Sequence, residues 1–176
     1  MNPIKSYIYR KIWGCIYGPR FYQERDIIKT KKAFEKSGLK MESWRTHSFG
    51  SNRITFKLLK KHGVKFVSDI VGEVKPFKEE IMQIPINIPV DVVTIAYGPW
   101  KPESRDPFAS CTKGRINPEE WFEIVKKRIK KNQDNGRDSI LLLHPTTMAV
   151  LDNFRTFEKI VQFISKYKSA KIKEFK

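Results

Sequence analysis

The feature that most constrains the fold is an alternation of short apolar segments with amphipathic helical segments, separated by short turns. A helix is predicted over residues 23–36, because apolar residues recur at helical spacing and a glycine follows the last turn. The next helix is predicted to start after a cap at Ser51 or Asn52 and to end before Gly63. The inward faces predicted for these two helices consist of Ile27, Ile28 and Phe34, and of Ile54, Leu58 and Leu59.

Extended segments are predicted around these helices. The piece LKMESWR precedes the second helix, and VKFVSD follows it as a strand. Residues 91–97, DVVTIAY, and residues 139–144, SILLLH, are predicted as further strands, the second of them fully buried. Residues 70–89, which include IPINIP, are expected to be an extended chain at a sheet edge or a covering loop.

Two more helices are predicted in the second half of the chain. The first follows a cap at Asn117, with a proline and two glutamates in its first turn, and the second begins at Asp152. Residues 98–116, rich in proline and charge, are predicted as a long surface loop near the mouth of a site. The buried stripes predicted for the two helices are Trp121, Ile124, Val125 and Ile129, and Phe154, Phe157, Ile160, Val161 and Ile164.

This order of elements predicts an α/β fold of mainly parallel strands joined by right-handed helical crossovers. The chain of 176 residues, 40% of them hydrophobic, is long enough for one core, so a single domain over residues 1–176 is predicted. Functional residues of such folds gather at the carboxyl ends of strands. His144 follows the apolar run ILLL at such an end, and Pro145 makes the chain leave the strand there.

Composition narrows the partners and the location. No apolar run approaches the roughly 20 residues that cross a bilayer, and no export signal is visible, so no membrane span and a cytoplasmic location are predicted. Cys15 and Cys111 lie too far apart for a zinc knuckle and are expected to be reduced thiols. The net charge of +16 favours weak contact with polyanions, but the lysine runs fit solvated helix faces, so nucleic-acid binding is not favoured.

Polar residues at three predicted strand ends suit acid–base chemistry. Arg45 lies in the loop WRTHSFGSN, Asp69 or Asp91 supplies an acid, and His144 supplies an imidazole. If they converge, the acid orients and charges the imidazole, and the arginine fixes a second carboxylate. Structural roles stay open for each: His144 could bond a neighbouring carbonyl, Arg45 could form a surface ion pair, and His62 suits the dipole at a helix C-terminus.

The ordered segments resemble the later part of a polysaccharide deacetylase with a NodB-homology domain. The resemblance covers about residues 22–168 and is carried by ERDIIKTKKAFEKSGLKMESWRTHSFGSNRITFKLLKKHGVKFVSD, by IPINIPVD and by ILLLHP. It implies an irregular (β/α) barrel, incomplete here, and a hydrolase that cleaves the amide C–N bond of N-acetylated sugars. In that family an aspartate is the base, a second aspartate and two histidines hold zinc, and a later histidine protonates the departing amine.

The resemblance assigns roles to individual positions. His144 matches the late general acid, Arg45 matches the arginine that positions the base, and Asp91 corresponds to the acid that tunes the histidine, with Asp69 as second choice. His47 stands where the family has a proline. The residues expected to bind substrate are Leu142, which matches the residue lining the acetyl pocket, His47 and Trp100.

Two motifs of the family have no counterpart in these 176 residues, namely the Asp-Asp strand end and the His-x-x-x-His pair. Zinc is therefore a cofactor of the family that is not expected in this chain alone, and no metal ligands are assigned. Either the chain is the C-terminal part of a longer product, with a partner chain supplying strands and metal, or it is a degenerate relative that retains a sugar groove. The expected partner is an N-acetylated carbohydrate or cell-envelope glycan. The alternative function is a non-catalytic basic module that binds anionic glycan or nucleic acid.

Overall fold

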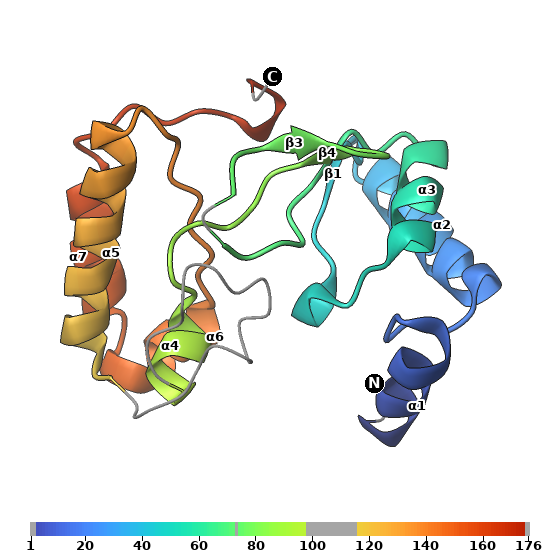
Figure 1. Ribbon diagram of the computed structural model, residues 1–176, viewed down its shortest axis with the longest axis horizontal. Helices are drawn as coiled ribbons and strands as arrows, with labels where there is room; N and C mark the ends of the chain where they lie inside the picture. The colour runs from blue at the N-terminus through green and yellow to red at the C-terminus, as the bar shows by residue number, and fades with distance from the viewer. Residues whose placement is uncertain (1–2, 73, 98–115, 175–176) are drawn as a thin grey trace. The chain divides into compact units, whose positions relative to one another are not determined.

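The computed structural model describes residues 3–72, 74–97 and 116–174 (Figure 1). Trp100, Cys111 and the predicted surface loop, apart from its last residue, lie outside the described residues. Among the helices that are described, none is long and apolar enough to cross a membrane. The architecture is mixed α/β, as the alternation of segments predicts.

The chain divides into two compact units that are not continuous in sequence. Unit 1 comprises residues 1–69, 76–84 and 172–176, and unit 2 comprises residues 70–75 and 85–171. The chain therefore passes from one unit to the other after Asp69, Lys75, Ile84 and Lys171. The single domain inferred from the length stays a prediction.

Unit 1 is built on a small four-stranded sheet in the order β1-β2-β4-β3. β1 pairs with β2 and β2 with β4 in parallel, whereas β3 and β4 are antiparallel, with Phe66 opposite both Ser43 and Met82. The helices α2 and α3 pack against each other beside it. The elements of unit 1 are α1 (Pro3–Trp13), α2 (Arg20–Lys36), β1 (Ser43–Trp44), η1 (His47–Phe49), α3 (Arg53–Lys61), β2 (Phe66–Val67), β3 (Phe77–Lys78), β4 (Met82–Gln83) and η2 (Ile172–Glu174).

Local signals placed α2, α3 and β2 where the sequence predicts them. Asn52 caps α3 through a reciprocal pair of hydrogen bonds with Thr55, and Gly38 adopts a φ of 69° just after α2, a conformation that favours glycine. Phe34 and Ile54, predicted to face inward, are instead exposed, whereas Ile27, Leu58 and Leu59 are buried as predicted. The core of unit 1 consists of Ile27, Met41, Leu58, Leu59, Val64, Val67 and Ile81.

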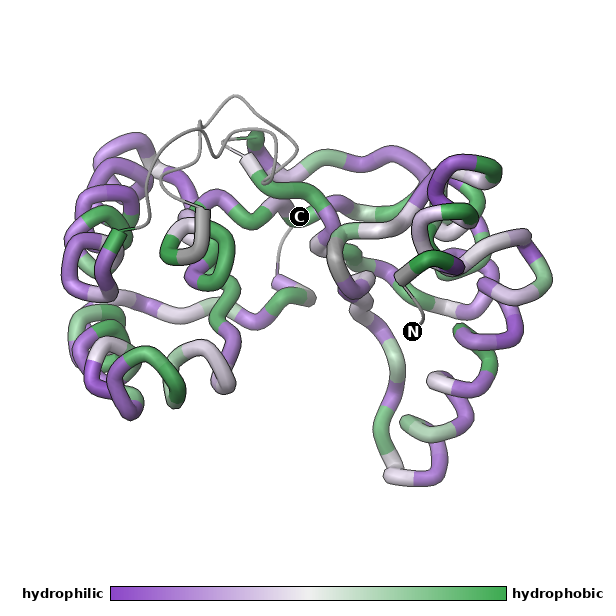
Figure 2. Tube along the Cα trace, turned by 90° about the horizontal axis from the view of Figure 1, so that it is seen from below, coloured by the Kyte–Doolittle hydropathy of each residue, from purple (hydrophilic) through white to green (hydrophobic). Residues whose placement is uncertain are grey.

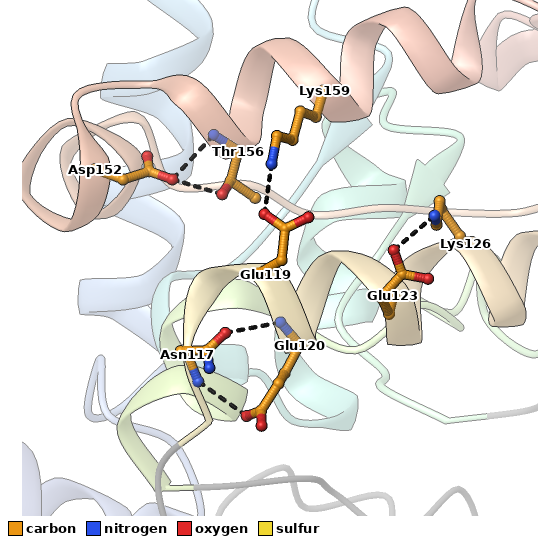
Figure 3. A network of polar contacts seen from close by, with 8 residues as sticks. All are labelled: Asn117, Glu119, Glu120, Glu123, Lys126, Asp152, Thr156 and Lys159. Atoms are coloured by element: carbon orange, nitrogen blue, oxygen red, sulfur yellow. Dashed lines mark hydrogen bonds and ion pairs between the residues drawn. The ribbon is translucent and has the colours of Figure 1, made fainter.

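Unit 2 is helical and contains α4 (Asp91–Tyr97), α5 (Pro118–Asp134), α6 (Pro145–Asp152) and α7 (Arg155–Ile164). The helices α5 and α7 lie side by side, and Lys159 Nζ on α7 lies 2.5 Å from Glu119 Oε2 on α5 (Figure 3). Asn117 caps α5 in a reciprocal pair with Glu120, as its sequence predicts. The core of unit 2 consists of Ile88, Ile95, Trp121, Phe122, Val125, Ile129, Met148 and Ile160.

Three predictions for unit 2 are wrong. Residues 91–97 form helix α4 rather than a strand, because burial against α5 overrides the β preference of DVVT. Residues 139–144 form no regular strand and are half-buried where they pack, since Ile140 pairs with Asn87 and Ile88 and not with a neighbouring strand. The last helix begins at Arg155 and not at Asp152, which ends the separate helix α6, because Asn153 and Phe154 adopt positive φ between the two helices.

The predicted stripes on α5 and α7 are partly correct. On α5 the residues Trp121, Val125 and Ile129 are buried. On α7 only Ile160 is fully buried among the predicted residues, while Val161 and Ile164 are exposed. Figure 2 shows hydrophilic and hydrophobic residues alternating along the helices of both units, as expected for helices with one covered face. The described strands form one small mixed sheet, and a (β/α) barrel is not shown.

Candidate functional site

Two groups of polar side chains carry the candidate chemistry, one in each unit. The first lies just beyond the carboxyl ends of the parallel strands β1 and β2 in unit 1, where Arg45 and Thr46 follow β1, and Ser68 and Asp69 follow β2. Parallel strands place the residues that follow them at one edge of a sheet. The second group is the pair of Asp91 and His144 in unit 2.

Asp69 is the buried centre of the first group. Its Oδ1 accepts a hydrogen bond of 2.6 Å from the backbone N–H of Thr46, its Oδ2 accepts one from the Thr46 hydroxyl, and the Ser51 hydroxyl also donates to it. Burial raises the pKa of this carboxyl above its ordinary value of 3.8, against the opposing effect of the hydrogen bonds and of nearby Arg45. Asp69 therefore ties β2 to the loop that follows β1.

Arg45, predicted to position a catalytic base, bonds to a neighbouring strand end. Its Nη2 donates a hydrogen bond of 3.0 Å to the Ser68 hydroxyl, which in turn donates to the carbonyl of Ile84 at 2.7 Å. The predicted substrate-binding residue His47 follows in η1 and is exposed. Arg45 and His47 both belong to unit 1, so the convergence of Arg45 with Asp91 and His144, which belong to unit 2, stays a prediction.

A small cavity of about 30 Å³ adjoins the first group and has room for about one or two water molecules. Beside it, the Thr55 hydroxyl donates to Gln23 Oε1 at 2.8 Å, and the Sγ of Cys15 lies 3.9 Å from the same hydroxyl. Cys15 is a free, buried cysteine, and burial raises the pKa of its thiol above 9.0, which makes it a poor nucleophile at neutral pH. The cavity is lined by Tyr17, Gln23, Asp26, Ile27, Trp44, Thr46 and Thr55.

In unit 2 the carboxylate of Asp91 holds His144 at two points. The backbone N–H of His144 donates to Asp91 Oδ2 at 2.8 Å, and the Nδ1 of the imidazole lies 2.6 Å from Asp91 Oδ1. Asp91 is fully buried at the start of α4, whereas the side chain of His144, which precedes α6, is 40% exposed. The structure therefore brings together two of the predicted site residues, although they lie 53 positions apart in the sequence.

The tautomer of His144 follows from this contact. A carboxylate oxygen can only accept a hydrogen bond, so Nδ1 carries the proton that points at Asp91. In the neutral ring Nε2 is then the free basic nitrogen, and in the charged ring it is a donor. The exposed fraction of the side chain leaves the ring accessible to a ligand, while its other edge is fixed by a buried acid.

Buried amides hold the segment that leads to His144. Asn87 Oδ1 accepts hydrogen bonds from the backbone N–H of Ile140 at 2.9 Å and from Asn132 Nδ2 at 3.2 Å, and its own Nδ2 donates to the carbonyl of Asp138. The segment that leads to Asp91 is held as well, because Trp121 Nε1 donates a hydrogen bond of 3.0 Å to the carbonyl of Pro89. Sequence analysis missed both asparagines, although an asparagine inside the apolar run IPINIP was the signal that could have found Asn87.

Leu142, predicted to line an acetyl pocket, lies in the segment that leads to His144, and its role stays a prediction. Its neighbours Leu141 and Leu143 pack on the core of unit 2. Leu142 is half-buried. Trp100, the remaining predicted substrate-binding residue, lies outside the described residues.

A zinc site needs several ligating side chains that meet at one point. Among residues 3–72, 74–97 and 116–174, no three histidine, cysteine, aspartate or glutamate side chains gather as a metal site would require. Asp91 is fully buried, and both of its carboxylate oxygens contact His144.

No protein-family model, no curated protein and no solved structure matches this chain.

The raised pKa of Asp69 predicts how stability responds to pH. The folded chain holds the Asp69 proton above the pH at which the unfolded chain releases it, so the free energy of unfolding falls as pH rises from about 3.8 through the raised pKa. Asn cannot titrate, so Asp69→Asn should abolish the part of the decline in the free energy of unfolding that comes from this carboxyl. Urea unfolding at a series of pH values should show a smaller decline for Asp69→Asn than for the wild type, and identical slopes would contradict the prediction.

Proposed function

We propose that the chain is a polysaccharide deacetylase-like protein, of the hydrolase class that cleaves the amide C–N bond of N-acetylated sugars. The observation that supports this proposal is the two-point contact between Asp91 and His144. It gives a partly exposed imidazole with a defined tautomer and a buried counter-charge, which is what a general acid needs. The resemblance to deacetylases of the NodB type supplies the substrate class and the barrel architecture as further parts of the proposal.

In the proposed chemistry His144 serves the departing amine. A base supplied by a partner chain would take a proton from water as the water oxygen adds to the carbonyl carbon of the acetamide. The C–N bond then breaks, and a proton passes from Nε2 of the charged imidazole to the amine nitrogen. The products are acetate and the free amino sugar. Asp91 keeps the imidazole oriented and compensates its charge, and Leu142 offers an apolar surface to the acetyl methyl group.

The proposal includes inactivity of the chain alone. The motifs that would supply zinc ligands and the base are absent from the 176 residues, and the described residues do not gather a substitute set of ligands. Asp91, at the start of α4, is held by His144, and Asp69, which follows β2, is held by Thr46, so each of these acids already has a structural role. Turnover would require a partner chain that supplies the missing strands, the base and the metal.

Binding and activity together test this proposal. We expect neutral N-acetylglucosamine oligomers to bind saturably and with little dependence on salt, and the chain alone to release no acetate. His144→Ala should weaken binding by about tenfold, the value of one good hydrogen bond. His62→Ala is the matched control, because His62 lies in unit 1 and pairs with Glu24 at 3.1 Å. Isothermal titration and an acetate assay provide the readouts.

Two results would contradict the proposal. If neutral N-acetylated sugars did not bind at all, the chain would have no binding site for the proposed substrate. Turnover by the chain alone that is abolished by a chelator and by His144→Ala would show that the metal and the base are present after all.

A non-catalytic basic module is the second candidate function. It is favoured by the net charge of +16 and by exposed lysines on α2, α3 and α5, such as Lys32, Lys60 and Lys127. Such a module would bind anionic glycan or nucleic acid with an affinity that falls steeply with salt, and would ignore neutral sugars. The same titrations, repeated at several salt concentrations, separate the two candidates.

A further inference from the structure

Helix α1 in unit 1 exposes a row of aliphatic side chains. Ile4, Ile8 and Ile12 are spaced by four residues and therefore share one face, and they are 69%, 45% and 64% exposed. Tyr7 beside this row is 64% exposed. Three isoleucines exposed in a row on one short helix form an apolar surface of the kind that marks an interaction site.

The cations of α1 flank this row. Lys5 and Lys11 lie on either side of it in the helical projection, with Lys5 Nζ 5.5 Å from the centre of the Tyr9 ring and Lys11 Nζ 5.8 Å from that of Tyr7. Arg10 adds a third positive charge. No acidic residue occurs in the sequence before Glu24, so all the charged side chains of the first 23 residues are basic.

An exposed apolar row with lysines on both sides suits a partner that is apolar inside and anionic at its surface. We infer that α1 binds the surface of an anionic lipid bilayer, lying in the plane of the interface with Ile4, Ile8 and Ile12 toward the acyl chains, Lys5 and Lys11 at the headgroups, and Arg10 adding positive charge on the opposite face. Lysine stems cover apolar surface while the ammonium groups stay in water, and aromatic rings favour the headgroup level. With 11 residues and a length of about 16 Å, the helix can lie on a bilayer and cannot cross one.

The charge pattern argues against the other apolar partners. A second copy of α1 packed on the same row in a two-fold dimer would bring Lys5 and Lys11 against the equivalent lysines, and facing like charges oppose association. A soluble polyanion would use the cations and leave the isoleucines uncovered. Helix α7 makes the contrast clear, because its exposed Val161 and Ile164 share a helix with Glu158, and its Lys159 pairs with Glu119.

The test measures binding of the whole chain to vesicles by co-sedimentation. We expect binding to vesicles of phosphatidylcholine mixed with phosphatidylglycerol and much weaker binding to phosphatidylcholine alone. The triple variant Ile4→Gln, Ile8→Gln, Ile12→Gln should bind the anionic vesicles at least about tenfold more weakly. Replacing Lys5, Arg10 and Lys11 by Gln should cost roughly fivefold per charge removed, an effect that added salt reduces.

A matched variant separates α1 from the overall charge. Replacing Lys60, Lys127 and Lys130 by Gln lowers the net charge equally on exposed sites outside α1, and should have a much smaller effect. Circular dichroism checks that each variant is folded, which is expected because the replaced side chains are exposed.

Several outcomes would overturn the inference. They are no binding of the wild type to anionic vesicles, equal binding by the isoleucine variant, and equal losses from the two basic variants. A concentration-dependent dimer in sedimentation velocity that the isoleucine variant abolishes, without vesicle binding, would assign the row to a second copy. None of these outcomes depends on sugar binding or on His144, so the inference stands or falls apart from the proposed function.

Discussion

Trp121→Ala is expected to lower the free energy of unfolding by about 3–5 kcal/mol, the largest effect of any change described for this protein. Trp121 is fully buried in the core of unit 2, and its indole N–H satisfies the carbonyl of Pro89. The substitution leaves a cavity among Ile88, Val125 and Ile160 and an unpaired carbonyl two residues before Asp91. Urea unfolding followed by circular dichroism measures the loss.

Trp121→Phe separates the two contributions. The phenyl ring keeps most of the apolar volume and loses the N–H, so the expected cost is about 1–2 kcal/mol. A loss below about 1 kcal/mol for Trp121→Ala would mean that the packing of α4 and α5 on this side chain contributes far less than its burial implies.

Asp91→Ala is expected to lower the free energy of unfolding by about 2–4 kcal/mol. It removes the acceptor of two hydrogen bonds from His144 and leaves the backbone N–H of that residue without a buried partner. Asp91→Asn keeps one carbonyl oxygen for that N–H, so about 1–2 kcal/mol is expected. These values sit in the lower part of the range for buried pairs, because the imidazole is partly solvated.

A double-mutant cycle isolates the side-chain contact. Because His144→Ala retains the backbone N–H that Asp91 also accepts, the coupling between Asp91→Asn and His144→Ala reports the contact of Nδ1 with Oδ1 alone. We expect a coupling energy of about 1–2 kcal/mol. Strict additivity of the two substitutions would mean that the imidazole is not fixed by the acid in solution.

Local sequence signals were sufficient for several elements but not for the pair of Asp91 and His144. The caps at Asn52 and Asn117 lie within a few residues of the groups they satisfy, so the starts of α3 and α5 could be predicted from sequence. The correspondence of Asp91 to the acid beside His144 came from a family resemblance, and the geometry agrees with it.

Other features depend on contacts that sequence does not display. Residues 91–97 have a strand-like composition but fold as a helix against α5, and Ile140 finds its partners in an asparagine side chain instead of a strand. Thr46 and Ser68 bond across the sheet edge with partners 23 and 16 residues away, a distance that no local pattern encodes. Helix α1 was missed although isoleucines recur at every fourth position and Gly14, with a φ of 62°, follows its last turn.

The interleaving of the two units limits how the protein can be divided. No single cut of the polypeptide yields one intact half, because residues 76–84 and the C-terminal end complete a unit begun at the N-terminus, and residues 70–75 belong with the segment that starts at 85. A ribosome-bound nascent chain cannot finish unit 1 until the whole of unit 2 has emerged. Proteolysis at the connections would likewise not release either unit as one continuous fragment. Fragments of the chain are therefore unsuitable for testing either candidate site.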